Sequence, residues 1–495
     1  MTNPKIQQKN ATVQMQERVY PNFGQTLIDE DNLLLMVDSY KNSHHLAFPK
    51  NMTRLTAYME ARGGEMTHTV MFGLQYALWR YLSKPITPEQ VREMAEVCRA
   101  HLVPFHEEGW MTIATELGGK LPLEIRAVPE GTSVPVRNAL MTVTNTHPDF
   151  AWLVGWVETV LQRAVWYPRT VASVSSFCRD DILMPALEKS CDTPLEIIGT
   201  RLHDFGARGV SSSESAALGG AAHLVNFMGT DTMEALRLLR NYYGADMPAI
   251  SLPAMEHNTI ISWGKEREVD AYANMLRQYA KPGSYVAMVM DSYDLKNAVS
   301  NHLGVTLKQQ IEESGATVIV RPDSGNPVDM VRMCLGLLDA RFGSQINAKG
   351  YKVLNHVRVI QGDGINPTSL REIVQAVLAD GFSLENVAFG MGGGLLQKVD
   401  RDTQKFAYKG SAAVIEGQVI PIYKDPLTDP GKRSKDGILD LVQVEGNYRT
   451  VRYDSFEALE ANRSASALVT VFKDGEILSA DTLEVIRNRS AAQLS

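Results

Sequence analysis

The chain lacks two sequence features that are typical of secreted proteins, namely paired cysteines and an apolar signal segment. Only four of its 495 residues are cysteine, and Cys98, Cys178, Cys191 and Cys334 form no C-x-x-C pair. Scattered cysteines of this kind predict buried free thiols rather than disulfides or a zinc site. The first twenty residues contain no apolar run typical of a secretory signal. We therefore expect a cytoplasmic protein in a reducing compartment.

Long apolar runs and an excess of positive charge are also absent. The most apolar long stretch, residues 150–167, contains Glu158, Gln162 and Arg163, which predicts a buried amphipathic helix rather than a membrane span. The net charge at pH 7 is −8, which argues against a general nucleic-acid or membrane surface but is compatible with a local basic pocket. We therefore expect neither a nucleic acid nor a membrane as partner.

Familiar catalytic motifs are missing as well. The chain contains no HExxH, no zinc-ligand spacing, no nucleophile elbow and no Walker A sequence. The pair Gly390-x-Gly392 lacks the third glycine of a dinucleotide-binding fingerprint. These absences argue against zinc hydrolases, serine hydrolases of the elbow type, and P-loop or Rossmann nucleotide-binding proteins.

The clearest motif that is present reads VIVRPDSGNPVD, at residues 318–329. Its β-branched run predicts a buried strand, and Arg321 and Asp323 follow where this strand should end. Asn326 followed by Pro327 is typical of the start of a helix. In parallel α/β folds, ligands bind at this end of the strands. The motif therefore predicts a binding site that contains both a cation and an anion.

The same strand–loop–helix unit recurs along the chain. Strand-like runs at 285–290, 318–320, 357–360 and 386–389 start roughly 30–40 residues apart, which is the spacing of βα units. Asp323 and Asp363 hold the same place before an Asn-Pro pair. An open sheet would gather its polar groups at one switch point, whereas here several strand ends carry them. We therefore predict a parallel β/α barrel.

The pattern outside these units predicts a second domain. We expect a loosely ordered arm at 1–20, an α+β domain built from 21–194 plus the C-terminal tail 405–495, and a β/α barrel catalytic domain at 195–404. Within the α+β domain, Leu33–Val37 and Arg54–Glu60 are expected to be strands, and residues 150–190 are expected to be helical.

Three stretches contain side chains whose role the residues alone leave open. Phe205 near Arg208 could stack a flat ring and hold an anion, or be a buried ring beside a surface cation. Asp231 could bind a ligand or begin a helix. His257 could be structural, or it could be a nucleophile or base oriented by a carboxylate such as Glu256.

Two further features suit phosphate. The glycines at 392–394 leave backbone N–H groups accessible, and Leu395 could open a helix whose N-terminus favours anions. A group of cations follows the predicted barrel and either forms a solvated basic face or binds a polyphosphate: Arg401, Lys409, Lys424, Lys432 and Arg433.

These motifs together resemble the nicotinamide phosphoribosyltransferase family over nearly the whole chain. The resemblance rests on DSYK (38–41), HDFGARGVSS (203–212), HLVNFMGTDT (223–232), PAMEHNTI (253–260), DSYD (291–294), RPDSGNP (321–327), VIQGDG (359–364), FGMGGGLLQK (389–398) and KDPLTDPGKRSK (424–435). It implies a homodimer with active sites at the dimer interface. The implied reaction transfers phosphoribosyl from 5-phosphoribosyl 1-pyrophosphate (PRPP) to nicotinamide, giving nicotinamide mononucleotide and pyrophosphate in NAD salvage.

The resemblance also implies roles for individual residues. Phe205, together with Tyr40 of the partner subunit, would sandwich the pyridine ring, and Asp231 would accept the carboxamide N–H. Arg321 would also contact the nicotinamide. ATP, as a facultative cofactor, would phosphorylate His257. The implied catalytic set is His257, Asp291, Arg321 and Asp323.

Phosphate and ribose would be held by a larger group. The resemblance implies that these residues bind the phosphoribosyl and phosphate groups: Arg62, Arg208, Asp323, Gly362, Asp363, Gly392, Gly393, Arg401, Lys409 and Lys424. It also implies Mg²⁺ as a cofactor, with aspartates near magnesium-linked oxygens and no side chain assigned as a direct metal ligand.

Two other functions are compatible with the sequence. The first is a nicotinate-using enzyme of the same superfamily, against which the carboxylate of Asp231 argues. The second is a non-catalytic phosphosugar-binding barrel, against which the intact set of His257, Arg321 and Asp323 argues.

Overall fold

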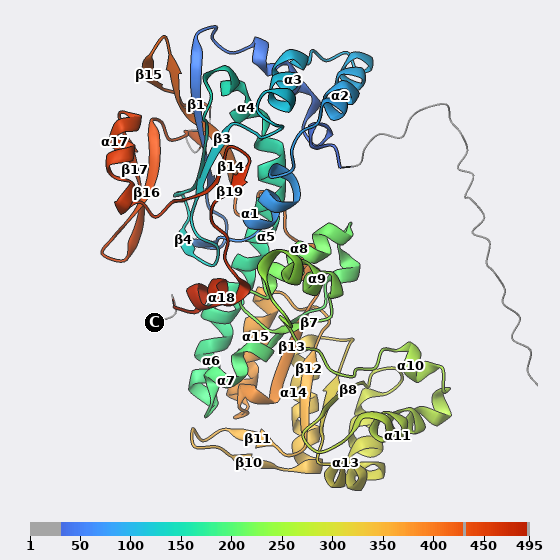
Figure 1. The fold of residues 1–495 in the computed structure, drawn as a ribbon. Helices are drawn as coiled ribbons and strands as arrows, with labels where there is room; N and C mark the ends of the chain where they lie inside the picture. The colour runs from blue at the N-terminus through green and yellow to red at the C-terminus, as the bar shows by residue number, and fades with distance from the viewer. Residues whose placement is uncertain (1–30, 429–431, 493–495) are drawn as a thin grey trace, which may run out of the picture.

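The computed structural model describes residues 31–428 and 432–492, which form two stacked halves (Figure 1). One half is built around a mixed α/β layer, and the other is a parallel β/α barrel. The arm predicted at 1–20 lies outside the described residues. Within the two described ranges, no helix combines the length and apolar character needed to cross a membrane. The domain boundaries predicted at residues 194 and 405 stay a prediction.

A seven-stranded sheet in the first half joins the two ends of the chain. Within it, the long strand β1 pairs antiparallel with β14 on one side and with β5 on the other. The strand predicted at Arg54–Glu60 is confirmed as part of β1. In spatial order the strands are β15 (Gln418–Pro421), β14 (Phe406–Ile415), β1 (Met52–Ala61), β5 (Ala139–Asn145), β3 (Leu123–Ala127), β18 (Val469–Lys473) and β19 (Glu476–Ile477).

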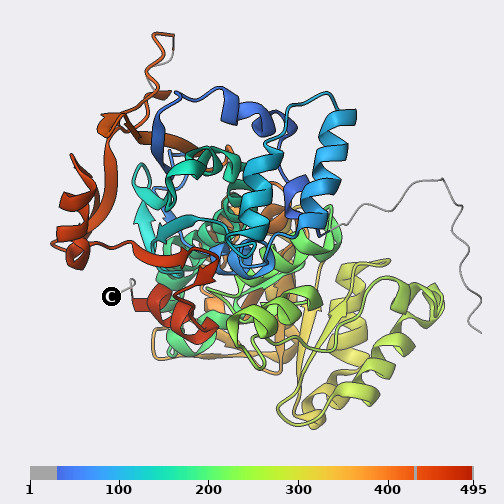
Figure 2. The ribbon, with the colours of Figure 1, turned by 45° about the horizontal axis from the view of Figure 1, so that its top comes forward.

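Helices cover one face of this sheet, and a C-terminal hairpin lies on the opposite side (Figure 2). Trp110 is buried between Trp152 and Trp156, whose rings it meets edge-on. The helices are α1 (Leu74–Ala77), α2 (Pro88–Ala100), α3 (Glu107–Thr115), α4 (Ala151–Trp156) and α5 (Glu158–Phe177). A small sheet pairs β2 (His68–Val70) with β4 (Ser133–Pro135). The helical prediction for 150–190 is confirmed.

The strand predicted at Leu33–Val37 is wrong. Residues Leu33–Leu35 form a 3-10 turn instead, and both Leu33 and Leu34 are buried. Asn32 caps the turn by accepting the N–H of Leu34 at 3.0 Å, and its amide donates to the Gln90 carbonyl oxygen at 3.1 Å. Because this turn docks on α2, consecutive leucines face the core, which a strand with alternating faces does not allow.

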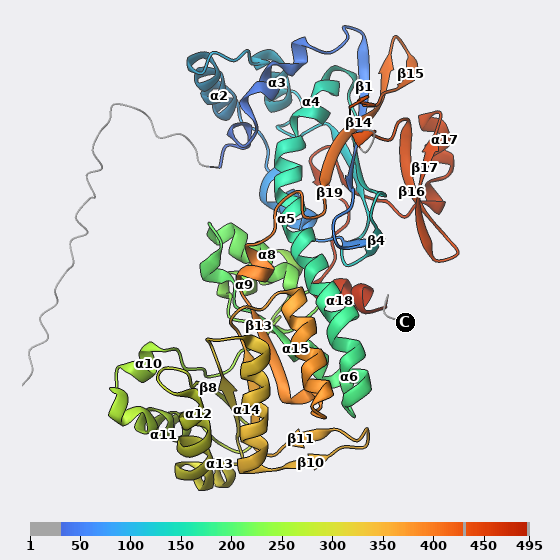
Figure 3. The same ribbon diagram turned by 180° about the vertical axis from the view of Figure 1, so that it is seen from behind.

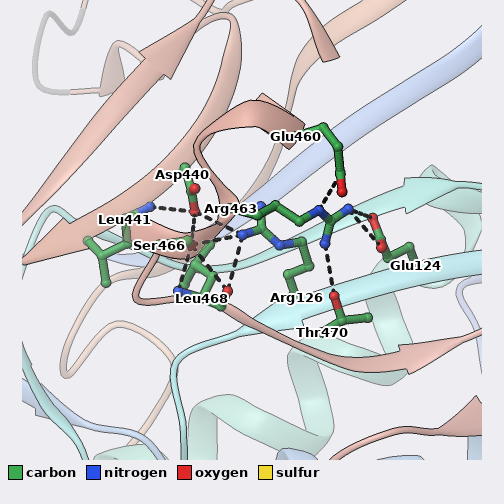
Figure 4. A network of polar contacts seen from close by, with 9 residues as sticks. All are labelled: Glu124, Arg126, Asp440, Leu441, Glu460, Arg463, Ser466, Leu468 and Thr470. Atoms are coloured by element: carbon green, nitrogen blue, oxygen red, sulfur yellow. Dashed lines mark hydrogen bonds and ion pairs between the residues drawn. The ribbon is translucent and has the colours of Figure 1, made fainter. Parts of the chain in front are cut away.

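A polar network fastens the C-terminal hairpin to the sheet (Figure 4). The hairpin consists of β16 (Ile438–Val444) and β17 (Asn447–Tyr453), and helix α17 (Phe456–Ala461) follows it. The buried Arg126 of β3 donates to Ser466 Oγ at 2.8 Å, and Ser466 donates to Asp440 Oδ1 of β16 at 2.6 Å. Arg463 donates to both carboxylate oxygens of Glu124, at 3.0 and 3.1 Å. Both of these contacts come from the Nη2 atom, while Nη1 donates to the Thr470 hydroxyl at 3.0 Å, so one side chain links the hairpin segment to β3 and β18.

Helix α5 connects the two halves (Figure 3). Its N-terminal part packs Leu161 and Val165 into the core of the seven-stranded half. Its C-terminal part packs Val171 and Val174 into the core of the barrel half. One helix therefore contributes to both cores.

The second half contains six parallel strands that curl into a barrel. Their order is β7 (Gly229–Thr230), β6 (Leu202–Asp204), β13 (Val387–Met391), β12 (Val357–Gln361), β9 (Thr317–Arg321) and β8 (Tyr285–Val289). The segment 250–254 bridges both edges, since Ile250 pairs with Gly229 and Ala254 pairs with Ala287. The four strands predicted from the βα spacing are confirmed, and so is the barrel.

The barrel interior is a thin apolar layer. Ala287, Ile319, Ile360 and Ala388 come one from each of four neighbouring strands, and together they form a separate buried cluster. Phe205 and Leu252 pack against this cluster from the end of β6 and from the bridging segment. Two alanines keep the layer narrow, so the sheet can close around it.

Helices surround the barrel on its outer side. They are α6 (Met184–Ser190), α7 (Pro194–Ile197), α8 (Ser213–His223), α9 (Met233–Tyr243), α10 (Asn258–Ile261), α11 (Glu268–Tyr279), α12 (Leu295–Asn297), α13 (Lys308–Ser314), α14 (Pro327–Phe342), α15 (Pro367–Ala379), α16 (Gly393–Leu396) and α18 (Leu483–Ala491). A hairpin of β10 (Ser344–Ile346) and β11 (Lys352–Leu354) follows α14. The helix starts predicted at the two Asn-Pro pairs are confirmed: Asn326 caps α14 and Asn366 caps α15.

Candidate active site

The ring of Phe205 lies at the carboxyl end of the barrel strands, against backbone that has no side chains. A Cβ atom at Gly390 would lie 2.0 Å from Phe205 Cε2, and one at Gly362 would lie 3.5 Å from the same ring. Phe205 itself is half-buried. Glycine at 390 is therefore required for the ring to occupy this place, and the ring caps the apolar layer below it.

A histidine and two carboxylates meet beside this ring. His257 Nε2 lies 2.9 Å from Asp291 Oδ1, and His257 Nδ1 lies 3.9 Å from Asp323 Oδ2. The backbone N–H of Asp323 also donates to Asp291 Oδ2, at 3.2 Å. Because a carboxylate only accepts hydrogen bonds, the proton of a neutral His257 ring is held on Nε2, and the lone pair is then on Nδ1.

Asp291 is suited to hold this tautomer. Burial alone would raise its pKa, but hydrogen bonds from Ser324 and His257 outweigh burial and lower the pKa below the usual value. A carboxyl group with a lowered pKa stays ionised from mildly acidic pH upwards. Asp291 can therefore accept a hydrogen bond from the Nε2–H group of His257 throughout the neutral pH range.

Several polar atoms at the same strand ends lack hydrogen-bond partners among the described residues, one of them Gln361 Oε1 at the end of β12. In the described part of the chain, the buried Nε of Arg321 and Oγ of Ser292 form no hydrogen bond. Arg321 also lies 3.6 Å from Asp323 Oδ2 through its Nη2 atom. Unsatisfied buried donors are costly in a folded protein. Their position beside the histidine and the carboxylates indicates a polar ligand.

Asp231 lies in the loop after β7 and is exposed. Its Oδ1 accepts the Ser251 hydroxyl at 2.6 Å, and its backbone N–H donates to the carbonyl oxygen of Asp204 at 3.1 Å. The N-cap of α9 is Thr232 rather than Asp231. The helix-start alternative for Asp231 is therefore wrong, and its carboxylate belongs to the loops around the barrel opening.

The glycine run ends β13 and begins α16. Helix α16 starts at Gly393, with Gly392 as its N-cap, two residues before the start suggested at Leu395. A Cβ atom at Gly394 would lie 2.5 Å from the Ile365 carbonyl oxygen, and one at Gly392 would lie 3.1 Å from that of Phe205. Close backbone packing therefore requires glycine at this tip, which also leaves the backbone of 392–393 uncovered by side chains.

The other predicted phosphate ligands form a second group, which we call the basic cluster: Arg62, Arg401, Lys409 and Lys424. Lys409 lies on β14, opposite Tyr58 of β1, and Arg62 follows β1. Burial lowers the pKa of Lys409, Glu158 opposes this shift, and the positive charges of the other three cluster residues add to it. Arg62 pairs with Glu60 at 2.7 Å and Arg401 with Asp402 at 3.1 Å, so these acids offset part of the positive charge. A group of four neighbouring cations still suits an anionic ligand.

The structure therefore separates the predicted residues into two groups on different elements. The first group lies around the barrel opening and consists of Phe205, Asp231, His257, Asp291, Arg321, Asp323, Gly362, Gly392 and Gly393. Asp363 lies exposed in the loop after β12. The basic cluster lies on the seven-stranded half. Arg208 is exposed in a short turn at Ala207–Gly209. Tyr40, with 59% of its surface exposed, lies on the 3-10 helix Ser39–Leu46 of the first half.

Sequence reasoning missed several residues of the site. Asp204, Ser251, Ser292 and Ser324 all contact or adjoin the residues described above. Three of them lie directly beside a predicted residue in the chain, so the signal was present in the motifs. No metal-binding group of three or more His, Cys, Asp or Glu side chains occurs in 31–428 or 432–492. The four cysteines are free and buried, as predicted.

Comparison with known proteins identifies the class. The model of the nicotinate phosphoribosyltransferase family matches residues 200–476, and that of the nicotinamide phosphoribosyltransferase N-terminal domain matches residues 32–125. The nicotinamide phosphoribosyltransferase of Xanthomonas campestris pv. campestris is 53% identical over 464 residues, covering 93% of this chain and 98% of that protein. The corresponding protein of Acinetobacter baylyi is 29% identical, covering 94% and 98%.

Solved structures show the same fold. The nicotinate-nucleotide pyrophosphorylase of Pyrococcus furiosus gives a TM-score of 0.58 at 17% identity, covering 96% of this chain and 98% of that chain. Human nicotinic acid phosphoribosyltransferase gives 0.55 at 15% identity, covering 92% and 93%. The fold and the site thus define a phosphoribosyltransferase of the barrel type. The chain belongs to the nicotinamide phosphoribosyltransferase family.

The place of the Phe205 ring can be tested through its supporting glycine. In Gly390→Ala, the new methyl group would overlap the ring and displace it. We expect the KM for the pyridine substrate to rise about tenfold or more, because stacking on an aromatic ring is worth about 1–3 kcal/mol.

Gly336→Ala is the matched control, since a Cβ there meets no atom within 4 Å. Steady-state kinetics with varied pyridine concentration would measure the effect. An unchanged KM in a folded Gly390→Ala protein would show that the ring does not support the substrate.

Proposed function

We propose that this protein is a nicotinamide phosphoribosyltransferase that forms nicotinamide mononucleotide and pyrophosphate from nicotinamide and PRPP, as a step of NAD salvage. The observation that carries the proposal is the arrangement at the barrel opening, where an aromatic ring, an exposed carboxylate and an unsatisfied arginine adjoin a carboxylate–histidine pair. The name of the 53% identical relative supports the same substrate. The reaction requires no general base, because the pyridine nitrogen is itself the nucleophile.

The base is recognised by stacking and by one hydrogen bond. The pyridine ring lies on Phe205, and Asp231 accepts the carboxamide N–H. Arg321, whose Nε lacks a protein partner, donates to the substrate. Orientation of the ring nitrogen toward the anomeric carbon is the main contribution of these contacts.

Bond cleavage at the anomeric carbon needs charge stabilisation. As pyrophosphate departs with the electrons of the C–O bond, positive charge develops on the ribose and negative charge on the leaving group. Asp323 and Asp363 bind the ribose hydroxyls, and the glycine backbone at 392–393 accommodates the 5′-phosphate. Arg208 and the basic cluster neutralise phosphate oxygens. Asp291, Asp323 and Asp363 would lie near a Mg²⁺ ion bound together with PRPP, and this ion would supply further positive charge at the leaving group.

ATP stimulates the reaction through His257. The Nδ1 lone pair attacks the γ-phosphorus of ATP, which forms an N–P bond as ADP leaves, and water later cleaves this bond. Asp291 holds the Nε2 proton and stabilises the positive charge on the ring. The observed pairing of Nε2 with Asp291 at 2.9 Å supports this assignment.

The active form is a cytoplasmic homodimer. Tyr40 is highly exposed and lies on a different half from Phe205. We infer that Tyr40 of the partner subunit covers the second face of the pyridine ring, so that the sites lie at the dimer interface.

A nicotinate-using enzyme is the second candidate. It is favoured by the family model that matches residues 200–476 and by the names of the solved structures with the same fold. Nicotinate would place its carboxylate beside that of Asp231. Like charges in a desolvated site cost several kcal/mol, which favours nicotinamide.

The preference between the two bases tests the function and the role of Asp231 together. We expect the wild-type protein to use nicotinamide far more efficiently than nicotinate, and Asp231→Asn to lose part of that preference because the repulsion is removed. The measurement is kcat/KM for both bases. Asp246→Asn is the control, since Asp246 is a fully exposed aspartate in the same half. Equal use of both bases by the wild type would reopen the nicotinate alternative.

The role of His257 is tested by separating ATP hydrolysis from synthesis. His257→Ala should keep slow ATP-independent mononucleotide formation and lose both ATPase activity and acid-labile labelling from γ-labelled ATP. His101→Ala, at an exposed histidine of the first half, should behave as wild type. ATPase activity that persists in the His257 variant would remove it as the phosphate acceptor.

Sharing of the site between subunits is tested by mixing two inactive variants. Tyr40→Ala and Asp231→Ala, once their subunits have exchanged, should recover about a quarter of wild-type activity, because half of the dimers are mixed and each has one intact site of two. The Tyr279→Ala variant, at an exposed tyrosine of α11, is the control for the first change. No recovery despite proven exchange would place Tyr40 in the site of its own chain.

A further inference from the structure

Asp204 is a completely buried carboxylate that lies directly before the stacking residue Phe205. It ends β6, and its side chain points away from the solvent into the space between the barrel and α8. Its two oxygens accept three hydrogen bonds, all from loops of the proposed base site. Burying a carboxyl group costs folding free energy unless its oxygens are hydrogen-bonded. These three donors therefore offset the cost of burying Asp204.

The three hydrogen bonds join the two loops that recognise the base. Asp204 Oδ1 accepts the N–H of Gly206 at 2.8 Å, which fixes the turn after Phe205. Asp204 Oδ2 accepts the hydroxyl of Thr230 at 3.0 Å and that of Thr232 at 2.7 Å, on either side of Asp231. The backbone of Asp204 adds a fourth link, since its carbonyl oxygen accepts the N–H of Asp231 at 3.1 Å.

Neighbouring residues depart from their usual local preferences to accommodate this carboxylate. Thr232 is the N-cap of α9, yet its hydroxyl donates to Asp204 and caps no N–H of the helix. Gly220 lies inside α8, where glycine costs about 1 kcal/mol relative to alanine. A Cβ at this position would lie 3.0 Å from Asp204 Oδ2 and 2.8 Å from Ala235 Cβ. Both departures allow the helices to close over the side chain.

We propose that Asp204 is a positioning residue for the pyridine-carboxamide substrate: it holds the ring of Phe205 and the carboxylate of Asp231 at a fixed separation. The stacking ring of Phe205 and the carboxamide acceptor Asp231 come from different loops. Recognition of the base therefore depends on the distance between these two loops. The carboxylate touches no substrate atom and acts through its hydrogen bonds. This inference rests on the proposed function, since it assigns the same base site.

The chemistry of the donors predicts graded effects. In Asp204→Asn, an amide N–H₂ replaces one acceptor oxygen, and the side chain can satisfy either Gly206 or the two hydroxyls as before, but not all three. Thr232→Val keeps the shape of the side chain and removes only one of the three donors. Both variants should loosen the base loops while leaving the His257–Asp291 pair intact.

The experiment is a kinetic comparison of both substrates. We expect Asp204→Asn to raise the KM for nicotinamide about tenfold, the loss expected when one buried hydrogen-bonding group is left without its partner. The KM for PRPP should rise by a smaller factor than that for nicotinamide, since Arg208 is the one proposed phosphate ligand in the turn that Asp204 holds. The ratio of nicotinamide to nicotinate efficiency should fall as well. Thr232→Val should shift the same quantities in the same direction by a smaller factor.

Two matched controls separate positioning from general stability. Asp440→Asn changes another completely buried carboxylate, which accepts from Ser466 and Leu441 in the C-terminal hairpin. Thr170→Val removes another buried hydroxyl, which donates to the Trp166 carbonyl oxygen in α5. Neither should change the ratio of the two KM values.

The outcomes distinguish the inference from the function on which it rests. A wild type that forms no mononucleotide from nicotinamide overturns the proposed function. An active wild type whose Asp204→Asn and Thr232→Val variants change both KM values equally, or neither, overturns the positioning role. If Asp204→Asn does not fold, Thr232→Val and Thr230→Val decide the question alone, because each removes only a hydroxyl group.

Discussion

Closure of the parallel sheet around a narrow apolar layer is the constraint on which the site depends. Ala287 and Ala388 keep the interior small enough for the strands to curl, and the segment 250–254 bridges the two edges. Closure brings the carboxyl ends of all strands to one opening. Phe205, Asp231, His257, Asp291, Arg321 and Asp323 come from loops that are distant in sequence, and they meet because this opening is small.

The opening combines groups that are satisfied within the protein and groups that are not. Asp291 is satisfied, since it holds His257, the Asp323 backbone and Ser324. Arg321 and Ser292 are not, because each buries a polar atom without a protein partner. The satisfied groups fix the geometry, and the unsatisfied ones indicate where a polar ligand binds. A preorganised site requires both kinds of group: polar groups whose hydrogen bonds hold the site in place, and donors that remain available to the ligand.

The basic cluster adds a second constraint. It lies on the seven-stranded half, whose sheet joins strands from both ends of the chain. Helix α5 contributes to the cores of both halves, so packing on this helix links them. A ligand with several phosphate groups is large enough to use charges from separate elements.

The sequence by itself determined the local features of this protein. The spacing of the βα units, the Asn-Pro helix starts and the glycine tip of β13 are each set by neighbours in the chain, and all are confirmed. The prediction from the sequence was wrong at Leu33–Val37. The apolar run there resembles a strand, but it forms a 3-10 turn that packs on α2.

Only the tertiary structure decided which side chains act together. The pairing of His257 with Asp291 spans 34 residues, and the link of Asp204 to Thr232 spans 28. Local patterns carry no information about such contacts, because they form only when the barrel closes. For the same reason Asp204, a plain acid in the sequence, becomes the buried link between the loop of Phe205 and the loop of Asp231.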